Sequence, residues 1–341
     1  MAWPRPNHLA VGRGHRMAWR DLGNPLGEPW LVLHGGPGSG AQPGLVAPLD
    51  RRWQRAIVPD QRGSGASQPR GATRGNHTAA LVADLEALRE RLGLPSWAVL
   101  AGSWGTVLAL AYARQHPQRV QRLVLRGAFA LSEREVAGLL LPGRARLKNL
   151  GEDPLWPARH RTPLPVVLRR LTQLLQSGTP GVAALRVARR WGVLEAALAE
   201  QGLWRSLHHA QRSGAVALAQ AIHASWAALR RRLQRAQAQA RRPQHLPADR
   251  AALAKFRVQA HYLRHRGFLR PGELDRAVLA VAEAGVPVDW VHGRCDAVCP
   301  PANSRRWAAR WGRLSEPLSG HLGQEPDMLS TLRNVVAGEA C

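Results

Sequence analysis

One serine stands where it could act as a nucleophile. Ser103 lies in LAGSWG, residues 100–105, after an apolar run and ahead of a helical pattern. A tight turn from a strand into a helix exposes a serine hydroxyl and needs small flanking residues, as in the G-x-S-x-G motif. Ala101 takes the first glycine position, so the match here is A-x-S-x-G. The pattern predicts Ser103 as a nucleophile, and the alternative is an ordinary Gly-Ser turn before a helix.

A serine nucleophile needs a general base and a carboxylate that orients the base. In proteins with this motif the carboxylate follows the serine along the chain, and the histidine comes last. Asp296 follows an apolar run in VHGRCDAVCP, and His321 stands in the Ser-Gly-His turn of LSEPLSGHLGQEP. Asp289 falls inside the expected strand, and His292 precedes Asp296, so both fit less well. The order predicts Ser103, Asp296 and His321 as a catalytic triad.

Two backbone segments near the serine could stabilise an oxyanion. A helix that begins after Ser103 has free N–H groups at its first turn, among them the N–H of Trp104. A second donor is expected from HGGPG, residues 34–38, because glycines let the backbone approach a carbonyl closely. A preorganised pair of such donors commonly stabilises a transition state by several kcal/mol. The alternative for HGGPG is an ordinary glycine-rich turn.

The elements around these residues indicate a parallel sheet. Residues 11–23 have the pattern of a hairpin. Apolar runs then alternate with helical patterns, which is typical of βαβ units. The strands are expected at 29–34, 54–59, 97–101, 121–126, 286–292 and 313–318, and the helices at 77–93, 104–116, 301–310 and the C-terminus.

The middle of the chain, from 131 to 280, has a different pattern. Its segments are helical, with expected helices at 165–177, 180–200, 203–238 and 247–266, and no convincing strand. We therefore expect an α/β core in two parts, 1–130 and 281–341, interrupted by an all-helical cap at 131–280.

Charge and cysteine content limit the other classes of function. The formal net charge is +25, which raises the question of nucleic-acid binding, but the arginines are scattered over many expected helices. Cys295 and Cys299 lack two further ligands at suitable spacing, so no metal site is expected. No run approaches the roughly 18 apolar residues of a membrane helix, and no secretory signal is visible. We expect a cytoplasmic protein that binds neither a membrane nor nucleic acid.

Taken together, the motifs resemble those of the proline iminopeptidases, also called prolyl aminopeptidases. The matching segments are HGGPGSG, DQRGSGASQP, GSWGTVLALAYARQHPQRV, GRCDAVCPPAN and SGH, in that order. The resemblance implies an α/β-hydrolase fold with a helical cap, no metal or organic cofactor, and release of an N-terminal proline from a peptide. It also implies that the N–H groups of Gly36 and Trp104 form the oxyanion hole.

The cap departs from the family pattern at the residues that recognise substrate. The family holds the free amino terminus of its substrate with cap glutamates, and the resemblance places Glu195 on the first of them. The second position, within RVQAHYL at 257–263, is occupied by Gln259, a neutral amide. A charge-assisted hydrogen bond is roughly twice as strong as a neutral one, so this replacement weakens the hold on a protonated amine.

The sequence therefore predicts a serine aminopeptidase that takes short peptides with N-terminal proline and needs no cofactor. Because Gln259 departs from the family, a serine esterase or amidase of the same fold is the alternative. A basic, non-catalytic binding protein on this scaffold is a third hypothesis, and it rests on the net charge of +25. The complete, ordered triad argues against that hypothesis. The oligomeric state does not follow from the sequence.

Overall fold

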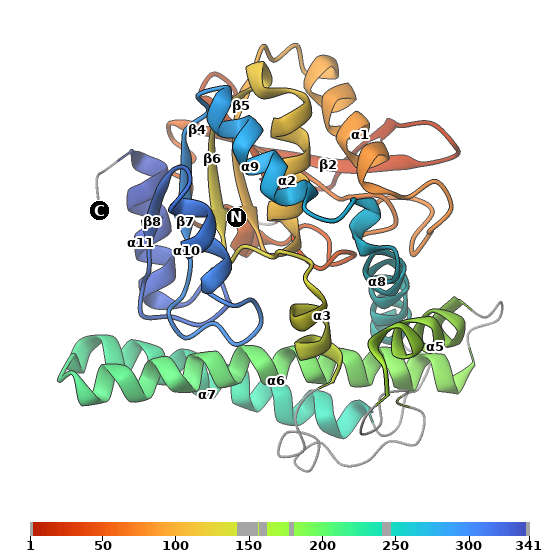
Figure 1. Cartoon of the computed structure of the whole chain (residues 1–341), viewed down its shortest axis with the longest axis vertical. Helices are drawn as coiled ribbons and strands as arrows, with labels where there is room; N and C mark the ends of the chain where they lie inside the picture. The colour runs from red at the N-terminus through yellow and green to blue at the C-terminus, as the bar shows by residue number, and fades with distance from the viewer. Residues whose placement is uncertain (1–2, 142–155, 157–161, 177–180, 241–246, 339–341) are drawn as a thin grey trace.

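The computed structural model describes residues 3–141, 156, 162–176, 181–240 and 247–338 (Figure 1). Within them an eight-stranded sheet has the order β1-β2-β4-β3-β5-β6-β7-β8. β1 and β2 run antiparallel to their neighbours, and all later pairs are parallel. The strands span Asn7–Ala10, Arg16–Gly23, Glu28–Leu33, Gln54–Pro59, Trp97–Gly102, Val120–Arg126, Val288–Val291 and Arg313–Ser315.

Both faces of this sheet are covered, as parallel strands require. Alternate residues of β3 separate into two cores: Leu31 and Leu33 pack in one, and Trp30 and Val32 in the other. The first core is completed by helices α1, α2, α9 and α10, and the second mainly by α11. These helices span Thr78–Arg91, Trp104–Gln115, Glu273–Glu283, Ala302–Ala308 and Pro326–Ala337. The expected α/β class is thus confirmed, and the hairpin is present with its first strand slightly earlier than expected.

The described part of the segment between β6 and α9 consists of helices and their connecting turns, with no strand. It contains α3, α5, α6, α7 and α8, which span Glu133–Leu140, Leu164–Gln176, Val182–Arg212, Val216–Ala240 and Pro247–Arg264. Figure 1 shows α6 and α7 lying side by side as a long pair across one end of the core. None of the helices in the described ranges is long and apolar enough to span a membrane.

One sequence prediction inside this segment is wrong. We expected helices at 180–200 and 203–238, but α6 continues without a break to Arg212. The turn comes at Gly214, which has a φ of +70° that favours glycine. Gly202 stays helical within α6, where the absence of a side chain lets the helix pass closely over backbone of the core.

The division into core and cap can be refined from the packing. α9 falls inside the expected cap range of 131–280, but it packs along α2 on the face of the sheet (Figure 1). Its buried residues Ala277, Val278 and Val281 join the core cluster that covers β5 and β6. We propose that the cap consists of α3 to α8 and that the second core segment starts with α9.

Candidate active site

Ser103 occupies the sharp turn between β5 and α2. Its φ of 56° and ψ of −127° are rare for a residue with a side chain, and such a conformation costs about 1–3 kcal/mol. The turn leaves no room for larger neighbours. A Cβ atom on Gly102 would lie 2.2 Å from Arg126 Nη2, and one on Gly105 would lie 2.7 Å from Leu33 O. This is the strained strand-to-helix geometry that presents a serine hydroxyl at the end of a sheet.

Ala101, which replaces the usual first glycine, causes no conflict at this turn. It lies on β5, pairs with Leu33 and Leu125 of the neighbouring strands, and is 1% exposed. Its methyl group packs into the larger core with Val99. The departure from G-x-S-x-G is therefore accommodated by a core contact.

Asp296 and His321 come together although 25 residues separate them in the chain. The N–H of His321 Nδ1 donates to Asp296 Oδ2 over 2.8 Å. Asp296 Oδ1 accepts from the backbone N–H groups of Val298 and Cys299, at 2.8 and 3.0 Å. Because the carboxylate only accepts, the Nδ1 proton leaves His321 Nε2 with a lone pair that can take up a proton. This is the arrangement of a general base and its orienting acid.

The surroundings of Asp296 keep it ionised. Burial by itself raises the pKa of this carboxyl, but the charge and hydrogen bonds of His321 and His292 outweigh burial and hold the pKa well below its ordinary value. His292, the rival base, lies just after β7 rather than within it, and its Nε2 is 3.3 Å from Asp296 Oδ2. Its Nδ1 is 2.7 Å from Ser304 Oγ. His292 is fully buried, so it supports Asp296 and has no access to a substrate.

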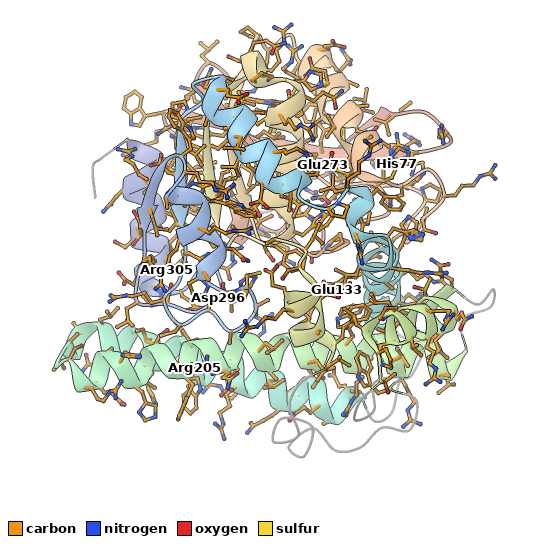
Figure 2. The ribbon with its side chains drawn as sticks, in the orientation of Figure 1. His77, Glu133, Arg205, Glu273, Asp296 and Arg305 are labelled. Carbon is orange, nitrogen blue, oxygen red and sulfur yellow. The ribbon has the colours of Figure 1, made fainter. Side chains whose placement is uncertain are left out.

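The end of β6 links the serine to the other two residues. The Ser103 N–H donates to Arg126 O over 2.9 Å. The next residue, Gly127, lies directly against the acid and base: a Cβ atom there would be 3.4 Å from both Asp296 Oδ2 and His321 Nδ1. The three predicted triad residues thus follow the carboxyl ends of β5, β7 and β8, and Gly127 at the end of β6 lies between them. Figure 2 shows Asp296 in the loops between the core helices and α6.

The HGGPG loop packs against the serine, as its position after β3 predicts. A Cβ atom on Gly35 would lie 3.1 Å from Ser103 Cβ. Gly36 has a φ of +117°, and a Cβ atom there would lie 2.8 Å from the N of Gly38, so this position requires glycine. Gln61 holds the start of this loop, because its Nε2 donates to His34 O over 2.8 Å. The loop that carries Gly36 therefore packs against Ser103 through Gly35, and Trp104 follows Ser103 directly at the start of α2.

Two residues that the sequence analysis missed hold the His321 loop. Glu325 accepts the N–H groups of Gly320 and Leu322, on both sides of His321, and Arg126 donates to His321 O. Burial raises the pKa of Glu325 to about 7, against the opposing effect of those two N–H groups. The only signal in the sequence was the Glu-Pro pair four residues beyond His321, at the start of the last helix.

The cap places Glu195 and Gln259 in contact, as their predicted shared role requires. Gln259 Nε2 donates to Glu195 Oε1 over 2.5 Å. The second carboxylate oxygen, Glu195 Oε2, accepts from Lys255 Nζ over 2.6 Å. Trp191 of α6 stacks on Phe256 of α8 with ring centroids 4.9 Å apart, which brings the two helices together at this point. Lys255 was not singled out in the sequence, because no local pattern connects it to a residue 60 positions away.

Two close approaches place this part of the cap over the triad. A Cβ atom on Gly202 of α6 would lie 3.0 Å from Cys295 O and 3.1 Å from Gly320 Cα, beside Asp296 and His321. A Cβ atom on Gly38 of the glycine-rich loop would lie 2.5 Å from Lys255 O of α8. Figures 1 and 2 show α6 running beneath the loops that carry Asp296. Glu195, Gln259 and Lys255 therefore lie on two helices, of which α6 contacts the loops of Asp296 and His321 and α8 contacts the HGGPG loop.

Comparison with known proteins agrees with this architecture. The family model described as alpha/beta hydrolase fold matches residues 29–327. Solved structures give the same fold: an alpha/beta hydrolase from a Medee basin deep-sea metagenome library has a TM-score of 0.59 at 12% identity, and covers 97% of this chain and 96% of its own. A 2-hydroxy-6-oxo-6-phenylhexa-2,4-dienoate hydrolase from a Rhodococcus strain has a TM-score of 0.55 at 14% identity, with 98% and 97% covered.

Sequence comparison goes further than the fold. A proline iminopeptidase of Xylella fastidiosa is 32% identical over 333 residues, which cover 95% of this chain and 93% of that protein. A proline iminopeptidase of Neisseria meningitidis is 32% identical over 337 residues, with 96% and 94% covered. The resemblance inferred from the motifs is confirmed: the chain belongs to the proline iminopeptidase family of α/β hydrolases.

Proposed function

We propose that this protein is a serine aminopeptidase that releases N-terminal proline from short peptides through an acyl-enzyme. The observation that carries the proposal is the ordered set of Ser103, Asp296 and His321 at one edge of the sheet, in a chain whose full-length relatives are named proline iminopeptidases. The proposal needs no metal or organic cofactor, because each step uses groups of the chain itself.

In the first half of the reaction, Ser103 Oγ attacks the carbonyl carbon of the first residue while its proton passes to His321 Nε2. Asp296 stabilises the resulting imidazolium and keeps the ring in position through the Nδ1 hydrogen bond. The carbonyl oxygen becomes an oxyanion, which the N–H groups of Trp104 and Gly36 would stabilise. The tetrahedral intermediate then collapses: the peptide C–N bond breaks, and His321 returns the proton to the leaving amine.

In the second half, water takes the place of the leaving peptide. His321 Nε2 removes a proton from the water as its oxygen attacks the ester carbon, and a second oxyanion forms in the same place. When this intermediate collapses, the proton returns to Ser103 Oγ and proline leaves as the free amino acid. Both halves use one base and one oxyanion site, so a single preorganised centre serves the complete cycle.

A direct test is hydrolysis of proline β-naphthylamide by the wild type and by Ser103→Ala. The wild type is expected to release naphthylamine, and the variant to lose that activity with its fold intact by circular dichroism. If the wild type does not exceed Ser103→Ala on this amide but hydrolyses p-nitrophenyl esters, the peptidase proposal is wrong while the hydrolase assignment stands.

That outcome would favour the second candidate, a serine esterase or amidase with another substrate. The observation behind it is the state of Glu195, whose two oxygens are already bound by Lys255 and Gln259. A panel of p-nitrophenyl esters and aminoacyl naphthylamides separates the two candidates. An esterase is expected to prefer the esters by more than their intrinsic reactivity explains and to be indifferent to a free amino group.

We also propose that the protein is located in the cytoplasm. Cys295 and Cys299 are buried free thiols next to the acid of the triad, and burial raises the pKa of both. Free thiols are compatible with a reducing compartment. Cell fractionation of a tagged protein tests the proposal, and recovery in the secreted fraction would contradict it.

A further inference from the structure

The cap cluster of Glu195, Gln259 and Lys255 contains one carboxylate and two internal donors. Glu195 Oε2 bonds Lys255 Nζ at 2.6 Å, and Glu195 Oε1 bonds Gln259 Nε2 at 2.5 Å. The side chains of Lys255 and Glu195 are 27% and 23% exposed, so the pair is partly screened and open to competition. Lys255 Nζ also lies 4.6 Å from the ring centroid of Phe256, a position that favours a cation.

An unused acceptor completes the cluster. Gln259 is 1% exposed, and its Oε1 has no hydrogen-bond partner among the described residues. A buried acceptor without a donor costs about 1–3 kcal/mol, which a ligand N–H group would recover. In this cluster the carboxylate of Glu195 is already paired with the ammonium of Lys255. The neighbouring acceptor, Gln259 Oε1, has no hydrogen-bond donor among the described residues.

We infer that Lys255 is a specificity-determining residue, whose ammonium occupies the position on Glu195 that the α-ammonium of a peptide substrate would take. This inference rests on the proposed function. A substrate with a free amino terminus then has to displace a tethered cation, and it gains the empty acceptor of Gln259 in return. Tethering holds the competing ammonium at a high local concentration, so the affinity for free-amine substrates is reduced.

Glu195 is the one carboxylate of the cap cluster, because Gln259 is a neutral amide. A substrate ammonium between two carboxylates would face no competitor, whereas here one carboxylate is shared between Lys255 and the substrate. The consequence is a selectivity based on charge: amine substrates bind weakly, and substrates without a positive charge at this end are not penalised. Removing the internal cation should therefore shift selectivity toward free-amine substrates.

Lys255→Met tests this consequence, because methionine keeps the length and apolar contacts of the lysine stem without the charge. We expect a KM for proline β-naphthylamide about threefold to tenfold lower than that of the wild type, with kcat within about twofold. The ratio of kcat/KM for this amide to that for p-nitrophenyl acetate should rise by the same factor. Lys255→Arg keeps a cation on Glu195 and should leave that ratio near the wild-type value.

Arg230→Met is the matched control. Arg230 of α7 pairs with Glu200 of α6 at 3.7 Å and lies over the ring of Trp226, and neither partner belongs to the cluster of Glu195, Gln259 and Lys255. In this control variant, KM and kcat for both substrates should equal those of the wild type. A rise of KM for proline β-naphthylamide in Lys255→Met, or an equal change in Lys255→Met and Lys255→Arg, would overturn the inference, because Lys255 would then only support the position of Glu195.

A binding measurement separates this inference from the proposed function. Prolinamide is tested as an inhibitor of p-nitrophenyl acetate hydrolysis, which does not require the enzyme to cleave an amide. We expect an inhibition constant about threefold to tenfold lower for Lys255→Met than for the wild type. Failure of the wild type on proline β-naphthylamide would refute the proposed function, whereas an unchanged inhibition constant would refute the role of Lys255.

Discussion

The sheet edge and the cap of this protein differ in how far they follow the pattern of their family. At the sheet edge, Ser103, Asp296 and His321 lie on three loops that follow parallel strands, and the departure from the serine motif, Ala101, packs in the core. In the cap, Gln259 stands where the family resemblance implies a second carboxylate, and Lys255 pairs with Glu195. In the proposed mechanism, the edge supplies the nucleophile, base and acid of acyl transfer, whereas the cap holds the charge on which we propose that substrate recognition depends.

From this difference we propose that chemistry and selectivity are separated in the chain. The triad depends on strand ends that neighbouring strands hold through backbone hydrogen bonds, so its geometry tolerates changes elsewhere. The cap cluster of Glu195, Gln259 and Lys255 depends on side chains of two helices, α6 and α8, which are in contact where Trp191 stacks on Phe256. A substitution at Glu195, Lys255 or Gln259 is therefore expected to change what binds without disturbing the reaction centre.

The largest expected effect lies at the sheet edge. Asp296→Asn removes the carboxylate that fixes the His321 tautomer, so kcat should fall about a thousandfold or more on every substrate. Measured on both proline β-naphthylamide and p-nitrophenyl acetate, the two losses should be similar, since the same base serves both. A fall of kcat for the amide alone would contradict the proposal that the sheet edge carries the chemistry and the cap carries the selectivity.

A smaller effect concerns Glu325, which clamps the His321 loop. Its pKa is raised from 4.5 to about 7 by burial, with Asp296 adding to the rise and Arg126 opposing it. A buried acid with a raised pKa binds its proton more tightly in the folded state, so its contribution to stability is lost as the pH rises from 4.5 through 7. Over this range, the free energy of unfolding of the wild type should fall by about 3 kcal/mol relative to Glu325→Gln.

Urea unfolding of both proteins at several pH values checks this prediction. Taking the difference between them removes the titration of the histidines, which both proteins share. A difference that stays constant between pH 4.5 and 8 would show that Glu325 is ionised throughout and that the loop is held without a linked proton.

The smallest expected effect compares two glycines of one helix. Gly192 and Gly202 both lie in α6, but a Cβ atom on Gly192 would meet the Phe256 ring at 3.6 Å, an ordinary contact. Gly192→Ala should stabilise the protein by about 0.5–1 kcal/mol through helix propensity. Gly202→Ala puts a methyl group 3.0 Å from Cys295 O, so α6 must shift against the catalytic loops.

Gly202→Ala should therefore gain less stability than Gly192→Ala and lower kcat/KM by roughly threefold to tenfold on both substrates. Urea unfolding and steady-state kinetics of the two variants provide the comparison. Equal behaviour of the two would show that α6 is free to move away from the loops without disturbing Asp296 and His321.

Much of the core could be predicted because its signals are local in the sequence. The run of β5, the small residues around Ser103 and the helical pattern of α2 occur within about twenty residues, and each agrees with the others. The order of Asp296 and His321 after Ser103 follows from the fold class. The β3 loop was placed beside the serine by the same topology, and the structure has Gly35 against Ser103.

The cap could be predicted only as helical. The break between α6 and α7 was misplaced because a glycine such as Gly202 is typical of a helix end. In the structure Gly202 lies inside α6 and allows close contact with Cys295 and Gly320. Lys255 meets Glu195 across 60 residues, and no periodic pattern records that contact. Side-chain pairing between distant helices is a tertiary property, and local propensity carries no information about it.

The separation of chemistry from selectivity is tested most directly by Glu195→Gln, assayed on proline β-naphthylamide and p-nitrophenyl acetate together. Glutamine keeps the size and one acceptor of the side chain but removes the anion that a substrate ammonium needs. We predict that kcat/KM for the amide falls about tenfold to a hundredfold while that for the ester stays within about twofold. An equal loss on both substrates, or no loss on the amide, would contradict the assignment of selectivity to the cap.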